Sequence, residues 1–200
     1  MQSGLKWFAQ TLWDLMKPPV KPADRATVHG EAVGRAVGAP SGISTSRQDG
    51  RNRPSMQDRY DALVRDMKQA YGVRVRRWRT STSGCAWEVH ASNGRTQRLI
   101  ESPYPRGPMS CAVFLHEIGH HAIGFKRYRP RCLEEYHAWK WSIDMMEARG
   151  FNVTDSVRRR MHDSLRYALG KAHRRGLRSI PGELQAFANP PQPVGSSNAR

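Results

Sequence analysis

The sequence predicts an α+β domain in which a helix, a small antiparallel sheet and further helices follow one another. Three observations lead to this prediction. Apolar residues recur at helical spacing through residues 55–72, strand-like segments follow over residues 73–102, and an apolar helical run begins near Met109. A chain of 200 residues accommodates one such domain together with tails, and we expect the domain to span residues 55–187.

The N-terminal quarter and the last residues are expected to lie outside this domain. Residues 1–17 carry apolar side chains at helical spacing and are followed by Pro18, which predicts a short amphipathic helix. Residues 18–54 are rich in Pro, Gly, Ala, Ser and Arg without sustained periodicity, as in a flexible linker. Residues 188–200 are expected to form a disordered tail.

Local signals define the first elements of the domain. Ser55 and Asp58 have the spacing of a capping box, and Gly72 can close the helix that starts there. Strands are expected over residues 73–76, 86–90 and 95–102, with Asn93-Gly94 as the turn between the last two. Because the last strand directly precedes the apolar helix, we expect it to offer an unpaired edge to which an extended peptide could add.

The apolar helix is expected over about Met109–Gly124 and contains the sequence His116-Glu117-Ile118-Gly119-His120. Residues four apart lie above one another on a helix, so the two imidazoles can meet on one metal ion. Glu117 projects to one side of this pair, where its carboxylate can accept a proton from a water molecule on the metal. The pattern is typical of a helix that binds Zn²⁺ and activates water, and Gly119 permits a second backbone or a ligand to approach.

A catalytic zinc ion takes three protein ligands and keeps one open position. The next helix is expected to start at Pro130, which brings Glu134 and Glu135 to the height of His120. At about 100° per residue, Glu135 falls near the centre of the inward face and Glu134 nearer its edge. We therefore predict Glu135 as the third ligand and keep Glu134 as the alternative; the glutamate that does not bind would orient a ligand histidine.

Other side chains of these helices have expected places. Ala138 and Ser142 are small and share the inward face, so the two helices can approach closely. His121 points about 100° away from His120, and we expect it behind the metal site or at the surface. A developing oxyanion needs a further donor. The sequence offers four candidates without choosing among them: Tyr128, Tyr136, His162 and Tyr167.

The motif His116-Glu117-x-x-His120, followed by a helix carrying Glu135-x-x-Ala138, resembles the ImmA/IrrE-type zinc metallopeptidases over about residues 56–150. The resemblance implies a zincin-like fold, zinc bound by His116, His120 and Glu135, and Glu117 as the general base. It further implies a cytoplasmic enzyme that hydrolyses peptide bonds of a protein substrate, such as a DNA-bound regulator.

The charge distribution suggests a second class of partner. The formal net charge is +16, and arginines crowd the region Arg158–Arg178. Residues 152–155 offer caps for a helix that is expected to run to about His173. Such a region can contact nucleic acid nonspecifically through phosphates, or it can be a solvated helix face. The alternative function is therefore a basic nucleic-acid-binding protein whose zinc site is structural or vestigial.

The cysteine content and the distribution of apolar residues bear on the cellular compartment of the protein. Three cysteines, none in a C-x-x-C pair, favour a reduced cytoplasmic compartment. No run of 18 apolar residues occurs, so we expect no transmembrane segment.

Overall fold

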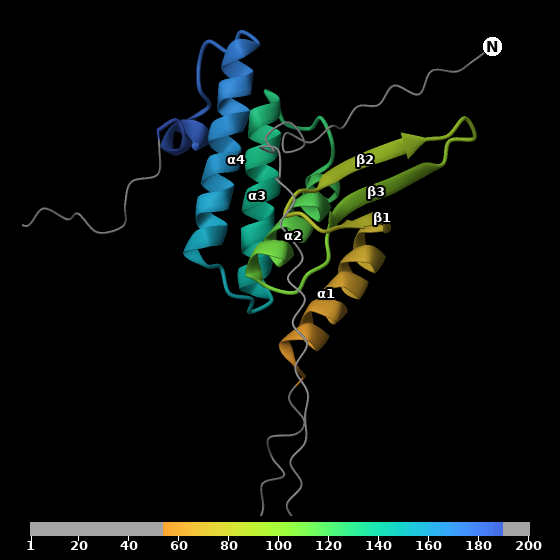
Figure 1. Ribbon diagram of the computed structural model, residues 1–200. Helices are drawn as coiled ribbons and strands as arrows, with labels where there is room; N and C mark the ends of the chain where they lie inside the picture. Colours follow the sequence, from red (N-terminus) through yellow and green to blue (C-terminus); the bar gives the residue numbers. More distant parts are fainter. Residues whose placement is uncertain (1–53, 190–200) are drawn as a thin grey trace, which may run out of the picture.

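The computed structural model describes residues 54–189 of the chain. The predicted N-terminal helix and linker, and nearly all of the predicted tail, lie outside these residues. The elements in chain order are α1 (Met56–Tyr71), β1 (Val73–Arg79), β2 (Cys85–His90), β3 (Thr96–Pro103), α2 (Pro108–Ile123), α3 (Arg131–Ala148), α4 (Asp155–Arg174) and the short 3₁₀ helix η1 (Gly182–Phe187) (Figure 1). The predicted mixture of helices with a small sheet is confirmed.

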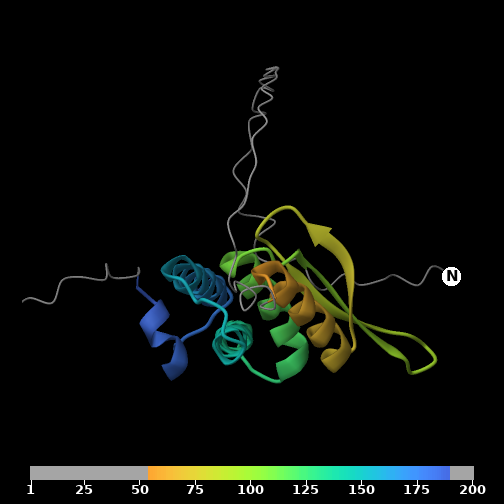
Figure 2. The ribbon, with the colours of Figure 1, turned by 90° about the horizontal axis from the view of Figure 1, so that it is seen from below.

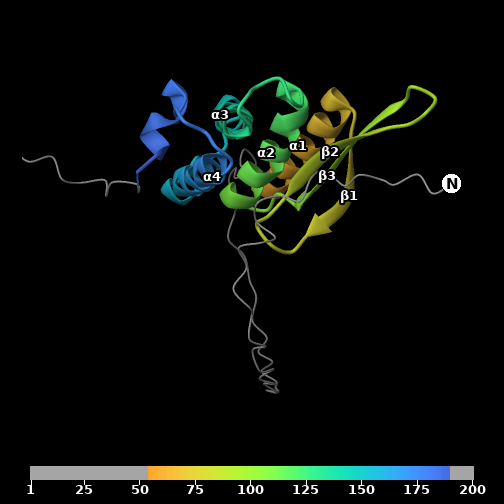
Figure 3. The same cartoon turned by 90° about the horizontal axis from the view of Figure 1, so that it is seen from above.

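Helix α2 occupies the centre of the fold. Views from below and from above show β3 and α1 on one side of it and α3 on the other (Figure 2, Figure 3). Helix α4 packs against α3 at the end of the molecule away from the sheet (Figure 1). The largest fully buried side chains come mainly from α1, α2 and α3, and they include Leu63, Met67, Phe114, Leu115, Ile118, Trp139 and Met146.

Helix α1 has the predicted ends. The Ser55 side chain accepts a hydrogen bond from the Asp58 backbone N–H at 3.1 Å, and the Asp58 carboxylate accepts one from the Ser55 backbone N–H at 2.9 Å. This reciprocal pair satisfies donors that the first helical turn leaves open. Gly72 ends the helix at φ 60°, a left-handed conformation that favours glycine.

The sheet differs from the prediction in two respects. Its strand order is β1-β3-β2, with β1 parallel to β3 and β2 antiparallel to β3. The predicted antiparallel sheet is therefore a mixed one, and the prediction that the last strand forms a free edge is wrong. The Asn93-Gly94 turn folds β3 back along β2, whereas loop 80–84 lets β1 pair with the other side of β3. Among the described strands, β1 and β2 form the edges.

Helices α2 and α3 approach each other closely. A Cβ atom built at Gly119 of α2 would lie 2.8 Å from the carbonyl oxygen of Ala138 on α3. Nearby, the Ser142 hydroxyl donates a hydrogen bond of 2.8 Å to the carbonyl oxygen of Ala112, and this bond is buried. Two predictions are thereby confirmed: Gly119 admits another backbone, and the small residues of the second helix let it come near.

Helix α4 begins at Thr154, whose hydroxyl accepts a hydrogen bond from the Val157 N–H at 3.3 Å. Leu165 and Leu169 bury the inner side of the helix, and Leu184 of η1 is fully buried in the same core. Within residues 54–189, no helix is both long and apolar enough to cross a membrane.

The substitution Gly119→Ala is expected to destabilise the protein by about 1–3 kcal/mol, because the added methyl group must displace backbone atoms of α3. A matched control is Gly170→Ala in α4, where the nearest atom to the new Cβ is Nη1 of Arg174 at 3.7 Å. That change should stabilise the protein by about 0.5–1 kcal/mol through better helix propensity. Urea unfolding of both variants checks this; equal effects of the two alanines would contradict the close-contact explanation.

Candidate metal centre

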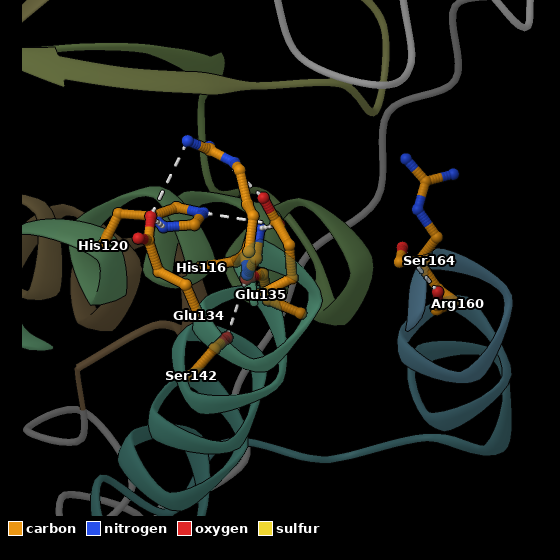
Figure 4. Close-up of polar contacts among 9 residues, drawn as sticks. His116, His120, Glu134, Glu135, Ser142, Arg160 and Ser164 are labelled. Carbon is orange, nitrogen blue, oxygen red and sulfur yellow. Dashed lines mark hydrogen bonds and ion pairs between the residues drawn. The ribbon is translucent and has the colours of Figure 1, made fainter. Parts of the chain in front are cut away.

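Three side chains from α2 and α3 converge at the interface of the two helices (Figure 4). The Nε2 atoms of His116 and His120 each lie 3.5 Å from Oε2 of Glu135. One ligand atom from each residue lies within 4.8 Å of the others, an arrangement that could hold a metal ion. The sequence predicted this set of residues, and the structure brings them together.

The distances from Glu135 to the two imidazoles suit metal coordination better than hydrogen bonding. Zinc bonds of 2.0–2.1 Å in tetrahedral geometry place neighbouring ligand atoms about 3.3–3.4 Å apart. The observed 3.5 Å between each imidazole and Glu135 is close to that value. Hydrogen bonds from nitrogen to oxygen are usually 2.7–3.2 Å long, so the same separation is too great for a good one. The donor set therefore fits the predicted ion.

Glu134 lies behind His120 rather than beside the other two ligand atoms. Its Oε1 atom is 3.6 Å from Nδ1 of His120, the ring nitrogen opposite the cluster. Its other oxygen, Oε2, accepts a hydrogen bond of 2.9 Å from the backbone N–H of Lys126. At 3.6 Å the carboxylate acts on the imidazole mainly through its charge, which helps to raise the pKa of His120. Glu134 thus occupies the place expected for the glutamate that does not bind the metal.

Aromatic rings hold both imidazoles in place. The His116 ring stacks on Trp139 with centroids 4.4 Å apart, and Trp139 is 2% exposed. The His120 ring lies parallel to Phe125 at 6.0 Å. These flat contacts restrict rotation of the two rings, so both nitrogen ligands are directed toward Glu135 before any ion binds.

The buried environment perturbs the titration of all three residues. Burial lowers the pKa of His116 to about 4, which keeps this imidazole neutral and able to bind a metal. Burial alone would also lower the pKa of His120, but Glu135 and Glu134 together raise it to about 10. Burial opposes ionisation of Glu135, yet the two histidines outweigh it and lower the pKa of that carboxyl. Without a metal, His120 and Glu135 therefore form an ion pair.

Glu117 is buried next to the cluster, with 3% of its surface exposed. Its Oε2 atom has no hydrogen-bond partner among the described residues, and burial raises the pKa of the carboxyl to about 8. Gly84, in the loop before β2, leaves the space that this carboxyl fills, because a Cβ atom there would overlap Oε1 of Glu117. Sequence reasoning missed Gly84, because this residue is far from the motif along the chain.

Arg160 is a second residue near the site that the sequence analysis missed. Its Nη2 atom donates a hydrogen bond of 2.6 Å to the carbonyl oxygen of Thr82, which links α4 to the loop before β2. The same loop carries Gly84, which adjoins the Glu117 carboxyl, so the Arg160 bond lies two residues along the chain from that contact. Figure 4 shows Arg160 on the neighbouring helix. The sequence placed it only within a run of basic residues.

Several other predicted candidates make contacts outside the candidate ligand set. His121 is buried, and its Nε2 atom lies 3.1 Å from the carbonyl oxygen of Leu99 on β3. The rings of Tyr136 and His162 both contact Phe187. Tyr128 stacks on His137, at 3.8 Å between ring centroids. No contact of Tyr167 with the cluster is found among the described residues.

The three cysteines do not join the cluster. Cys85, Cys111 and Cys132 are free thiols and buried. Burial raises the pKa of Cys85 and of Cys111 to about 12, so these thiols stay protonated. Among the described residues, the candidate ligand set consists of two histidines and one glutamate.

Comparison with known proteins identifies no relative: no protein-family model, no curated protein and no solved structure matches this chain. The chemistry of the cluster therefore has to be argued from its own geometry.

We expect the purified protein to bind one zinc ion per chain and to lose it on His116→Ala. Glu135→Gln should weaken zinc binding more strongly than Glu134→Gln, because only Glu135 would contribute a metal ligand. Loss of an orienting group such as Glu134 typically costs about 10–100-fold in affinity. Competition with a chromophoric chelator measures each constant, and Glu183→Gln, an exposed residue of η1, is the control. The reverse order of the two variants would exchange the roles assigned to the glutamates.

Proposed function

We propose that this protein is a zinc-dependent metallopeptidase of the zincin type, as the resemblance to the ImmA/IrrE-type enzymes implies. The convergence of His116, His120 and Glu135 beside the buried Glu117 carboxyl carries the proposal. Three protein donors leave one coordination position for a reactant, as in catalytic zinc sites. A structural zinc ion, the alternative, usually has four protein ligands with cysteine among them. No cysteine of this chain belongs to the cluster, which favours catalysis.

Glu117 is the proposed general base. Zinc, when bound, supplies a Lewis acid that polarises a peptide carbonyl and lowers the pKa of water to about 7. Glu117 would accept a proton from the attacking water and deliver it to the departing amine. Its burial against Gly84 fixes the carboxyl and excludes bulk water, so no competing hydrogen bonds weaken it as a base.

The proposed substrate is an extended segment of a protein. Strand β2 is an edge of the sheet and starts at Cys85, directly after the glycine that touches Glu117. An extended peptide that paired with this edge would pass beside the carboxyl. The edge strand β2 thus takes the role that the sequence analysis gave to the last strand.

Arg160 is the proposed donor to the developing oxyanion. It is a partly buried cation, and its bond to the Thr82 carbonyl holds it against the loop before β2, the loop that also carries Gly84 next to Glu117. A guanidinium offers several N–H groups in one plane, so it can keep this bond while donating to a second acceptor. Of the four candidates from the sequence, Tyr128, Tyr136 and His162 have their rings in other contacts.

We expect Glu117→Gln to retain zinc but to lose peptide cleavage by at least about 100-fold, since the amide has the same shape and cannot accept the proton. Zinc-loaded wild-type and variant proteins are incubated with a diverse peptide mixture, and new termini are identified by mass spectrometry. Glu183→Gln should cleave as the wild type does. Cleavage by the variant at the parent rate would exclude Glu117 as the base.

Arg160→Ala is expected to lower kcat about 100–1,000-fold on a peptide found in that mixture, while KM changes little. Arg160→Lys should recover part of kcat because it restores the charge without the planar geometry. Zinc content and thermal unfolding of both variants are measured in parallel. A rise in KM at unchanged kcat would mean that Arg160 only positions the loop or binds the ground state.

A further inference from the structure

Helix α4 carries most of its charge on the side that faces away from the core. Between residues 155 and 178 the chain has eight arginine or lysine residues and two aspartates. Two of these arginines are engaged: Arg158 pairs with Glu147 at 3.0 Å, and Arg160 bonds to Thr82. Arg159, Arg166 and Arg174 are exposed, and none of them has an ion-pair partner within residues 54–189.

These three arginines form a row along the helix, which we call the α4 ridge. They are separated by seven and eight residues, so the ridge extends over about 22 Å at about 1.5 Å per residue. Helix α4 lies at the end of the molecule opposite the sheet (Figure 1, Figure 3). The short helix η1 packs against part of α4, but the three arginines of the ridge stay exposed. Arginines without ion-pair partners in such a row repel one another. An extended anion bound along the row would reduce this repulsion.

We propose that the α4 ridge binds the phosphate backbone of a nucleic acid duplex without sequence preference. A duplex carries about one charge per 1.7 Å of its axis, so about 13 phosphate charges lie along a 22 Å ridge. Arginine binds phosphate through two parallel hydrogen bonds, which favours it over lysine for this contact. This inference concerns a surface separate from the metal centre and does not depend on the proposed peptidase activity.

The exposed side chains of α4 favour a duplex over single strands and over a membrane surface as the ligand. Single strands are held mainly by stacking of bases on aromatic side chains, and the exposed positions of α4 include no tryptophan, phenylalanine or tyrosine. Binding at a membrane surface requires an apolar helix face turned outward. The apolar side chains of α4, including Val157, Leu165 and Leu169, are buried in the core instead. The exposed side of α4 therefore offers a ligand mainly positive charge, which the phosphates of a duplex can neutralise.

The test uses the full chain and a fluorescent 24-base-pair DNA duplex of arbitrary sequence. In the ridge variant, Arg159, Arg166 and Arg174 are replaced by Gln; in the matched control, Lys68, Arg74 and Arg95 are replaced by Gln. The control residues lie on α1, β1 and the β2–β3 hairpin, are exposed and have the same total charge. Neither set includes a residue of the metal centre.

The ridge variant should bind the duplex at least about tenfold more weakly at 50 mM salt, and the slope of log K against log salt should be smaller by about 2.7. The control should change affinity by less than about threefold. A second variant with Lys at the three ridge positions should keep most of the affinity, which also shows that the substitutions leave the surface intact.

Four results would overturn the proposal. They are unchanged duplex binding by the ridge variant, equal losses in the ridge and control variants, loss of binding in the lysine variant, and tighter binding of the wild type to single strands or to anionic lipid vesicles than to the duplex.

Discussion

The contact between Gly119 and Ala138 determines how closely α3 approaches α2, and the metal centre depends on that separation. A Cβ atom at position 119 would lie 2.8 Å from the Ala138 carbonyl oxygen, so any side chain there would force the helices apart. Glu135 is one turn before Ala138 on α3, and its oxygen lies 3.5 Å from both imidazole nitrogens. A functional site tolerates errors of only about 0.5 Å in the positions of its side chains. A shift of α3 away from α2 would therefore disrupt the convergence of the three ligand atoms.

Much of the site could be predicted from the sequence because its residues belong to two consecutive helices. Spacing alone placed His116 and His120 on one face, and helical geometry favoured Glu135 over Glu134. The strand order could not be predicted in this way. The pairing of β1 with β3 joins residues that are distant along the chain, and no local signal specifies it. Gly84 and Arg160 were missed for the same reason, since only the tertiary fold brings Gly84 against Glu117 and Arg160 to the loop that carries Gly84.

The centre is a costly arrangement for a folded protein without a ligand. Buried atoms that lack a hydrogen-bond partner include Nδ1 of His116 and Oε2 of Glu117, and each such atom costs about 1–3 kcal/mol. A core built for stability alone would place apolar side chains here. The concentration of unsatisfied groups around one point indicates that the site is shaped for a function other than stability, and these atoms lie on the residues that would hold a metal ion or adjoin it.

Helix α4 connects the two proposed surfaces because adjacent residues of a helix point about 100° apart. Arg160 extends toward the loop before β2 and the metal centre, whereas Arg159 is exposed on the outer side. A duplex held on the outer side would therefore lie one helix diameter, about 10–12 Å, from the side that faces the centre. A protein bound to the same duplex would thus be held on the same molecule as the proposed peptidase site. Nucleic acid would then act by raising the local concentration of a substrate, with no change in the chemistry of the site.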